Sequence, residues 1–367
     1  MEEKTPSKNP KLRQILIAAV AVFAALLFAV LLLQRGGSAP SGADAQAEAY
    51  TLDSSAKQVF RALDGRLAVA SSSGLQLFDE NGSSVLHEIF SLAEPGLTVG
   101  AGRAAAYDIG GTELTVADFD GGVQTVAVSG AIVSASLNDS GYLTVVTDAA
   151  GYKGMVTVYD TDCNAVYGWY SGKGYVMNAA LSDNNSRLAV LCAEEGGSAV
   201  HLFSLDSEDE RGCYTAANEL FSDLYWIDGG RVCALSQSRL AFLNDSGALT
   251  GEYGYDGMYL YDYSKDGDGF FTLLLSQYRS GGAAKIVTVS PGGTMLGETV
   301  PDGDVESVSV CGKQVLVCGG GKLTLYNQQM ERLKQADQDL LGVRRALLLQ
   351  RGKALLVYDY SAQSYAL

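Results

Sequence analysis

The sequence predicts an all-β protein built from repeated four-stranded sheets and preceded by one membrane-spanning helix. Three observations lead to this prediction: a β-rich composition, one long apolar segment, and a unit that recurs about every 41 residues. The 43 Gly and 20 Tyr, against 6 Pro and 2 His, are typical of many short strands joined by tight turns. With 47% hydrophobic and only 19% charged residues, the chain can bury a large core and is not disordered as a whole.

The net charge argues against a nucleic-acid partner. The chain has 26 Lys and Arg against 42 Asp and Glu, which gives a net charge of −16. Such a chain is repelled by phosphate backbones and by anionic lipid surfaces. We therefore expect no binding to nucleic acid.

The first element is an apolar segment over residues 15–33. These 19 residues contain no charge, no Gly and no Pro. As a helix they would be about 28 Å long, close to the ~30 Å thickness of a bilayer's hydrocarbon core. Basic residues outnumber acidic ones before the segment, so we expect residues 1–14 to be a cytoplasmic tail and the remainder to lie outside. The sequence thus predicts a single-pass protein of the cell membrane.

A cleaved signal peptide is the alternative to this anchor, because Ala43-Asp44-Ala45 resembles a small-residue cleavage site. That site lies about a dozen residues beyond the apolar segment, which is itself longer than the usual 7 to 15 residues of a signal peptide. Residues 34–48 are small and polar and predict a flexible linker. Residues 49–367 are then expected to form one ectodomain.

A repeated unit occupies this ectodomain. It consists of a tight turn rich in Gly, Asn and Asp, an apolar strand, a second turn, another apolar strand and a polar turn. The last apolar residues of the second strand follow one another at steps of 37 to 46 residues: Phe78, Phe119, Tyr159, Phe203, Leu243, Val289, Tyr326 and Ala366. This period is the length of one four-stranded blade of a β-propeller.

Each unit is expected to contain four strands. Inner strands are predicted at Val59–Leu63, Tyr175–Leu181 and Met258–Tyr263, and outer strands at Ser84–Phe90 and Ala165–Tyr170. Eight units predict eight blades, with seven as the alternative. The eighth unit has only three strands, at Val343–Leu349, Lys353–Tyr358 and Ser364–Leu367, while the run Ala49–Leu52 has no partner in the first. We expect Ala49–Leu52 to supply the missing outer strand and close the ring.

These repeats resemble the β-propeller superfamily that includes WD40-like and quinoprotein-like proteins. More narrowly, the chain resembles single-pass, membrane-anchored bacterial propellers of unknown function. The resemblance covers Asp53 to Leu367 in architecture, and the anchor adds Ile15 to Leu33. No blade ends in the Trp-Asp pair that is typical of WD40 repeats; Tyr159-Asp160 and Tyr358-Asp359 are loose equivalents.

Residue types that carry catalysis are scarce. His87 and His201 are the only histidines, each in a strand-like run, and no GxSxG motif occurs. Asp262, Asp266 and Asp268 suggest calcium, but they miss the spacing of a calcium loop, and other units carry similar acids in β-turns. We expect no catalytic residues, no metal site and no cofactor.

The six cysteines lie in the predicted ectodomain, where disulfides are possible. No CxxC motif indicates a zinc site. A two-residue turn at Gly312-Lys313 would pair Cys311 with Gln314 and Cys318 with Ser307, so Cys311 and Cys318 would not face each other. We expect small apolar packing roles and leave disulfides open: Cys163, Cys192, Cys213, Cys233, Cys311 and Cys318.

Aromatic residues are concentrated in the predicted loops of one rim of the ring. Tyr and Trp combine a large apolar area with a polar group, and they are enriched at recognition surfaces. The alternative is that Tyr is simply a favoured strand residue. The candidate binding residues are Tyr152, Lys153, Trp169, Tyr170, Tyr175, Tyr255, Tyr259, Tyr278 and Arg279.

The functional hypothesis is a membrane-tethered, extracytoplasmic propeller that acts as a non-enzymatic binding platform. Its expected partner is an envelope or membrane protein, or a cell-surface ligand. An enzyme of the quinoprotein or polysaccharide-lyase kind is one alternative, because propellers accommodate both. A purely structural spacer is the other.

Overall fold

The computed structural model describes residues 49–53, 57–207, 209–227, 230–282, 284–337 and 340–367. Throughout these residues the chain forms strands and turns and no helix, so no described segment is a helix that could span a membrane. The expected anchor at 15–33 and linker at 34–48 lie outside the described residues, as does the expected tail at 1–14.

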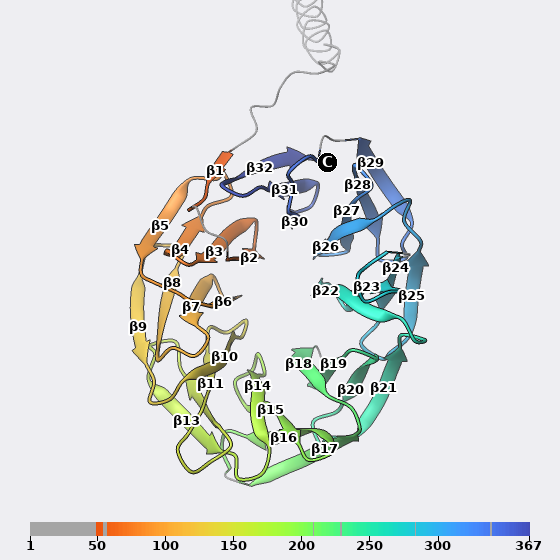
Figure 1. Ribbon diagram of the computed structural model, residues 1–367. Helices are drawn as coiled ribbons and strands as arrows, with labels where there is room; N and C mark the ends of the chain where they lie inside the picture. Colours follow the sequence, from red (N-terminus) through yellow and green to blue (C-terminus); the bar gives the residue numbers. More distant parts are fainter. Residues whose placement is uncertain (1–48, 54–56, 208, 228–229, 283, 338–339) are drawn as a thin grey trace, which may run out of the picture. The chain divides into compact units, whose positions relative to one another are not determined.

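Within the described residues, thirty-two strands form eight antiparallel sheets of four strands each (Figure 1). Blades 1 to 4 contain, in order, β2 (Gln58–Leu63), β3 (Arg66–Ser71), β4 (Gly74–Phe78), β5 (Ser84–Ile89); β6 (Pro95–Gly100), β7 (Arg103–Asp108), β8 (Glu113–Asp118), β9 (Val123–Ala127); β10 (Ile132–Leu137), β11 (Leu143–Thr147), β12 (Met155–Tyr159), β13 (Ala165–Tyr170); and β14 (Tyr175–Leu181), β15 (Arg187–Glu194), β16 (Gly197–Ser204), β17 (Glu210–Ala217).

Blades 5 to 7 repeat this order, and blade 8 is completed from the other end of the chain. They contain β18 (Phe221–Ile227), β19 (Arg231–Ser236), β20 (Arg239–Leu243), β21 (Leu249–Gly254); β22 (Tyr259–Gly267), β23 (Phe270–Ser276), β24 (Ala284–Val289), β25 (Met295–Thr299); β26 (Val305–Cys311), β27 (Gln314–Gly319), β28 (Lys322–Asn327), β29 (Arg332–Asp337); and β30 (Arg345–Gln350), β31 (Lys353–Val357), β32 (Ser361–Ala366) with β1 (Ala49–Thr51).

The predicted eight blades and the closure of the ring are confirmed. β1 pairs with β32, with Ala49 opposite Gln363 and Thr51 opposite Ser361. Tyr50 lies at the centre of this pairing, fully buried, and its ring packs edge-on against Phe78 of blade 1 at 5.5 Å. The first strand of the chain thus completes the last blade and also contacts the first.

Apolar side chains fill the spaces between adjacent blades. Between blades 1 and 2, for example, buried alanines and leucines of β3 and β4 pack against those of β6 and β7. Small residues such as Ala68, Ala70, Ala104 and Ala106 let the twisted sheets approach closely. Since each blade buries its faces only against its neighbours, the ring is expected to fold as one unit.

The inner strands are joined by a recurring polar position. In blades 3 to 7 the inner strand has a β-bulge, and the residue after it is polar: Ser134, Asn178, Asp223, Asp262 and Ser307. Each of these side chains hydrogen-bonds to the next blade; for instance, Ser134 Oγ donates to Met177 O at 3.0 Å and Ser307 Oγ accepts from Ala346 N at 3.1 Å. Bulges re-aim side chains. Here they direct polar groups across the blade boundaries around the centre of the ring.

One rim of the ring carries uniform turns, and we call it the turn rim. It contains the connections from first to second strands and from third to outer strands. In six blades the turn from the third to the outer strand begins with a side-chain oxygen that caps it. This oxygen accepts hydrogen bonds from the backbone N–H groups two and four residues later. These residues are Asp79, Asp118, Asp160, Asn244, Ser290 and Asn327.

Candidate functional site

The opposite rim concentrates the exposed aromatic residues, and we call it the tyrosine rim. It contains the connections from second to third strands and from each outer strand to the next inner strand. Every exposed aromatic side chain in the described part of the chain lies on these connections or at the strand ends beside them: Tyr152, Tyr170, Tyr175, Tyr261, Tyr278 and Tyr360. Leu220, Val300 and Leu341 are also exposed here. The turn rim has no exposed aromatic residue among those described.

The first cluster on this rim lies where blade 3 meets blade 4, and we call it the blade 3–4 patch. The rings of Tyr152 and Tyr170 are in contact, with centroids 4.7 Å apart. Lys153 Nζ donates to Tyr175 OH at 3.1 Å and lies 4.5 Å above the same ring. Backbone bonds fix the loop, since Lys153 N donates to Ser171 O at 2.8 Å. The four exposed side chains therefore form one ordered surface with phenol and ammonium donors.

The second cluster lies on blade 6, and we call it the blade 6 patch. Arg279 is 5.3 Å from the ring centroid of Tyr259, and Tyr278 on the same loop is exposed. Tyr261 is exposed as well and lies against Gly281 of that loop. Both patches thus combine exposed tyrosines with one cation, and blade 5 stands between them.

Three of the nine candidate residues are not exposed: Tyr259 is half-buried beneath Arg279, and two others pack between blades. Trp169 lies on β13 and faces blade 4, where its ring packs against Phe203 at 5.0 Å. Tyr255 is only 1% exposed and packs in the core between blades 5 and 6. Strand alternation turns Trp169 toward blade 4 and leaves it half-buried, and Tyr255 is buried although its connection belongs to the tyrosine rim. Neither residue presents an exposed ring on that rim. Tyr261, Leu220 and Tyr360 are exposed rim residues that the sequence analysis missed.

A polar network also joins the inner strands of blades 4, 5 and 6. The carboxylate of Asp223 accepts hydrogen bonds from Asn178 Nδ2, from Tyr225 OH and, at 2.8 Å, from Tyr263 OH. The two phenol oxygens are 2.5 Å apart. Burial and the nearby Asp223 charge raise the pKa of both tyrosines, so they stay protonated and donate. The network therefore connects three adjacent blades through hydrogen bonds to one carboxylate.

The acidic residues suggested for calcium do not converge in the described structure. Asp262 accepts from Tyr263 N at 2.9 Å and from Val308 N of blade 7 at 3.4 Å, and it lies 3.6 Å from Arg345. Burial raises the pKa of Asp262, and Arg345 opposes that effect. Asp268 is exposed in a turn of the other rim. Asp262 therefore has a structural partner of its own.

A cluster of mixed donor atoms lies on the face of blade 4 that packs against blade 3. His201 Nδ1 is 3.0 Å from Glu210 Oε1, and His201 Nε2 is 3.3 Å from Glu194 Oε1. The donor atoms of His201, Glu210 and Cys213 all lie within 4.8 Å of one another. Burial would lower the pKa of His201, but hydrogen bonds to Cys192, Cys213 and Glu210 raise it to about 11. In the sequence, His201 lies in a strand-like run, which gives no sign of this cluster.

The six cysteines are free thiols in the structure. Cys192, Cys233 and Cys318 are buried in the blade cores, as expected for small apolar side chains, while Cys213 is exposed. The predicted pairings of Cys311 with Gln314 and of Ser307 with Cys318 are confirmed.

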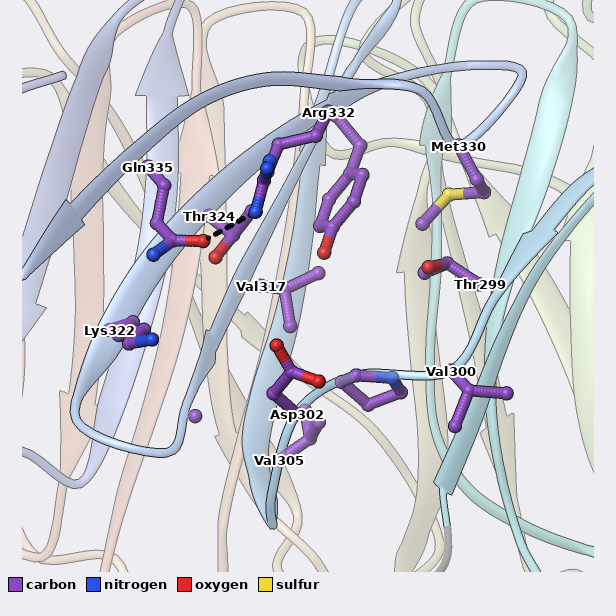
Figure 2. Close-up of a pocket in the computed structure, with 13 residues that line it drawn as sticks. Thr299, Val300, Asp302, Val305, Val317, Lys322, Thr324, Met330, Arg332 and Gln335 are labelled. Carbon is purple, nitrogen blue, oxygen red and sulfur yellow. Dashed lines mark hydrogen bonds between the residues drawn. The ribbon is translucent and has the colours of Figure 1, made fainter.

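A hollow of about 330 Å³ lies between blades 6 and 7 (Figure 2). Lys322 and Arg332 supply positive charge to it and Asp302 supplies negative charge, while Arg332 donates to Gln335 Oε1 at 3.0 Å. Its lining includes no His, no Cys and no pair of carboxylates. These groups do not form a recognisable catalytic arrangement.

Comparisons with known proteins agree with this architecture. A family described as a family of unknown function, DUF5711, matches residues 43–339. The chain belongs to the DUF5711 family. No curated protein matches it in sequence.

Solved structures show how widely the fold of this DUF5711 protein occurs. The C-terminal WD40 domain of Sif2 is 13% identical with a TM-score of 0.61, and the match covers 86% of this chain and 97% of that one. Sqt1 of Chaetomium thermophilum, bound to the N-terminus of ribosomal protein L10, is 10% identical with a TM-score of 0.59 over 88% and 100%. BamB from Moraxella catarrhalis is 13% identical with a TM-score of 0.56 over 87% and 98%. At these identities the likeness shows the fold alone.

Proposed function

We propose that this DUF5711 protein is a non-enzymatic, membrane-tethered platform that binds a protein partner through its tyrosine rim. The observation that carries the proposal is that, among the described residues, the exposed aromatic side chains all lie on that one rim. Apolar residues scattered singly over a surface are normal and need no explanation. Apolar residues that cluster on one surface are typical of interaction sites.

The chemistry of the rim suits a protein that offers hydrogen-bond acceptors. The tyrosine hydroxyls, Lys153 and Arg279 can all donate hydrogen bonds. The tyrosine rings provide a large contact area at a low cost in conformational entropy. The two patches flank blade 5, and exposed Leu220 lies on the same rim between them in chain order. Sqt1, a propeller of similar fold, is bound to a terminal segment of another protein, which supports a protein partner in general terms.

The anchor at residues 15–33 and an extracytoplasmic location are part of the same proposal. The apolar segment and the charges around it support them. β1 is the outer strand of blade 8 and runs from the turn rim toward the tyrosine rim. Its first residue, Ala49, is therefore at the turn-rim end of the strand.

Crosslinking in the native membrane tests this function. The full-length protein is crosslinked, purified through a tag and analysed by mass spectrometry, alongside a variant with Tyr152, Tyr175 and Tyr278 changed to Ala. A matched control changes Val166, Leu249 and Met295 to Ala, because these exposed apolar residues lie on outer strands. We expect a stoichiometric protein partner that the rim variant loses and the control keeps. Equal recovery with both variants would contradict the proposal.

A further inference from the structure

We propose that His201, Glu210 and Cys213 bind a divalent transition-metal ion, with Zn²⁺ as the natural occupant. His201 on β16 is directly opposite Cys213 on β17. Glu210 lies on β17 on the other side of the bulge, opposite Phe203. The alternation of strands therefore places an imidazole, a thiol and a carboxylate on one face of blade 4. Their donor atoms lie within 4.8 Å of one another.

The distances suit a small contraction around an ion. Zn²⁺ binds nitrogen at about 2.0–2.1 Å, sulfur at about 2.3 Å and carboxylate oxygen at about 2.0–2.2 Å, so donors in a tetrahedral site are roughly 3.3 to 3.8 Å apart. His201 is held in place, with its side chain 16% exposed, whereas the side chain of Glu210 is 41% exposed. Glu210 and the exposed Cys213 can therefore close on the ion while the imidazole stays fixed.

A second carboxylate orients the imidazole. Glu194 Oε1 is 3.3 Å from Nε2, on the opposite side of the ring from Glu210. Histidines that bind metals usually donate their other N–H to such a carboxylate, which fixes the tautomer and the ring orientation. The ring of Trp169, from blade 3, packs beside the imidazole with the ring centroids 5.9 Å apart. Glu194 is thus a positioning residue, and Nδ1 is the atom left for the metal.

The donor set selects the kind of ion. A thiolate and an imidazole favour Zn²⁺ over Ca²⁺ or Mg²⁺, which prefer oxygen ligands. Ionised Glu210 and Cys213 balance the two positive charges of the ion. Three protein ligands leave one coordination position open to water. Zn²⁺ binds a thiolate and an unprotonated imidazole nitrogen, so metal binding is expected to release protons.

Titration of the full-length, chelator-treated protein with Co²⁺ and with Zn²⁺ tests the site. We expect one ion per chain, a thiolate-to-Co²⁺ charge-transfer band and tetrahedral Co²⁺ absorption. Co²⁺ should also quench Trp169, so the quench should persist in Trp226→Phe and disappear in Trp169→Phe. Cys213→Ser should abolish the charge-transfer band and weaken Zn²⁺ binding by roughly tenfold or more, whereas Cys163→Ser, a control at another cysteine, should change neither.

Two further variants separate the roles of the residues. His201→Gln should weaken Zn²⁺ binding by at least about a hundredfold, and Glu194→Gln should weaken it by roughly 10- to 100-fold while leaving the Co²⁺ spectrum intact. Thermal melting of each variant shows that it is folded, and Cys213 is exposed, so its exchange for Ser removes no core contact. Absence of stoichiometric binding, or binding that survives both Cys213→Ser and His201→Gln, would overturn the site and leave only an ion-paired histidine.

Discussion

The ion pair between Glu219 and Arg239 provides the sharpest test of how adjacent blades are held together. Glu219 follows the outer strand of blade 4, and Arg239 begins β20 in blade 5. The carboxylate accepts from Arg239 Nε at 2.9 Å and Nη2 at 2.7 Å, and from the hydroxyls of Ser236 and Ser238 at 2.7 and 2.8 Å. Its side chain is only 16% exposed.

The change Glu219→Gln keeps the shape of the side chain and removes its charge. An amide N–H₂ would then face the guanidinium, so at least one charge-assisted hydrogen bond is lost, at about 1.5–3 kcal/mol. An unfolding entropy of roughly 2.1 cal/mol/K per residue gives residues 49–367 about 0.67 kcal/mol/K. A loss of about 2 kcal/mol therefore lowers Tm by about 3 °C.

The pH dependence identifies the charge as the cause. Burial raises the pKa of Glu219, but the hydrogen bonds from Arg239 and the serines outweigh it and lower the pKa overall. Its contribution to stability is therefore complete above the unfolded-state pKa of about 4.3 and disappears as the pH falls through the lower folded-state value. We expect the Tm difference between wild type and Glu219→Gln to be constant near neutral pH and to vanish in acid.

Calorimetry of the wild type and two variants from pH 3 to pH 8 measures this difference. The control is Glu252→Gln, because Glu252 also pairs with Arg239 but its side chain is 53% exposed, so its loss should cost less than about 1 kcal/mol. Equal effects of the two substitutions at pH 7 would refute the reasoning. So would a Glu219→Gln difference that persists unchanged at pH 3.

Three further substitutions test the ring. Tyr50→Ala should destabilise the fold by about 3–5 kcal/mol in urea unfolding, because the buried ring joins the first and last blades; an effect below about 1 kcal/mol would argue against closure through β1. Tyr263→Phe should cost about 1 kcal/mol by removing one donor to Asp223, and an unchanged unfolding midpoint would mean that this hydrogen bond adds nothing. Gly74→Ala should cost at least about 2 kcal/mol in thermal melting, since φ is +137° and a Cβ would collide with Glu88 O; wild-type stability would exclude that geometry.

The fold was predictable because each unit repeats its turn chemistry. Side-chain oxygens such as those of Asp79 and Asp160 cap the backbone of equivalent turns, so similar residues recur at similar spacing. Two strand boundaries were missed by several residues. β22 was expected at Met258–Tyr263 and extends to Gly267, and the last strand was expected at Ser364–Leu367 and is found at Ser361–Ala366. Its sequence has little alternation of apolar and polar residues, so it did not show where pairing with β31 begins.

Part of the candidate site was predictable and part was not. Alternation along Ala165–Tyr170 already implies that Trp169 and Tyr170 face opposite sides, so it was foreseeable that one of them is less exposed. Tyr255 gave no such signal, because it lies in a turn. Aligning the units would have shown the polar position at Asp223 and Asp262. The donors of the proposed metal site meet only through strand register and a bulge, which the sequence does not specify.

The lengths of the connections explain why binding is assigned to the tyrosine rim. On the turn rim, the connections between third and outer strands are nearly constant in length, as in residues 119–122 and 244–248. The side-chain oxygens that cap these turns already accept hydrogen bonds from backbone N–H groups of the same turn. On the tyrosine rim, the connections between second and third strands vary in length. Residues 195–196 form a short connection, and residues 148–154 and 277–283 form long ones. The two longest are the ones that carry Tyr152 with Lys153 and Tyr278 with Arg279. A sheet hairpin needs only two residues to close. The extra residues are therefore not needed to close the hairpins, although some of them bond to neighbouring strands, and they place exposed tyrosines and cations on this rim.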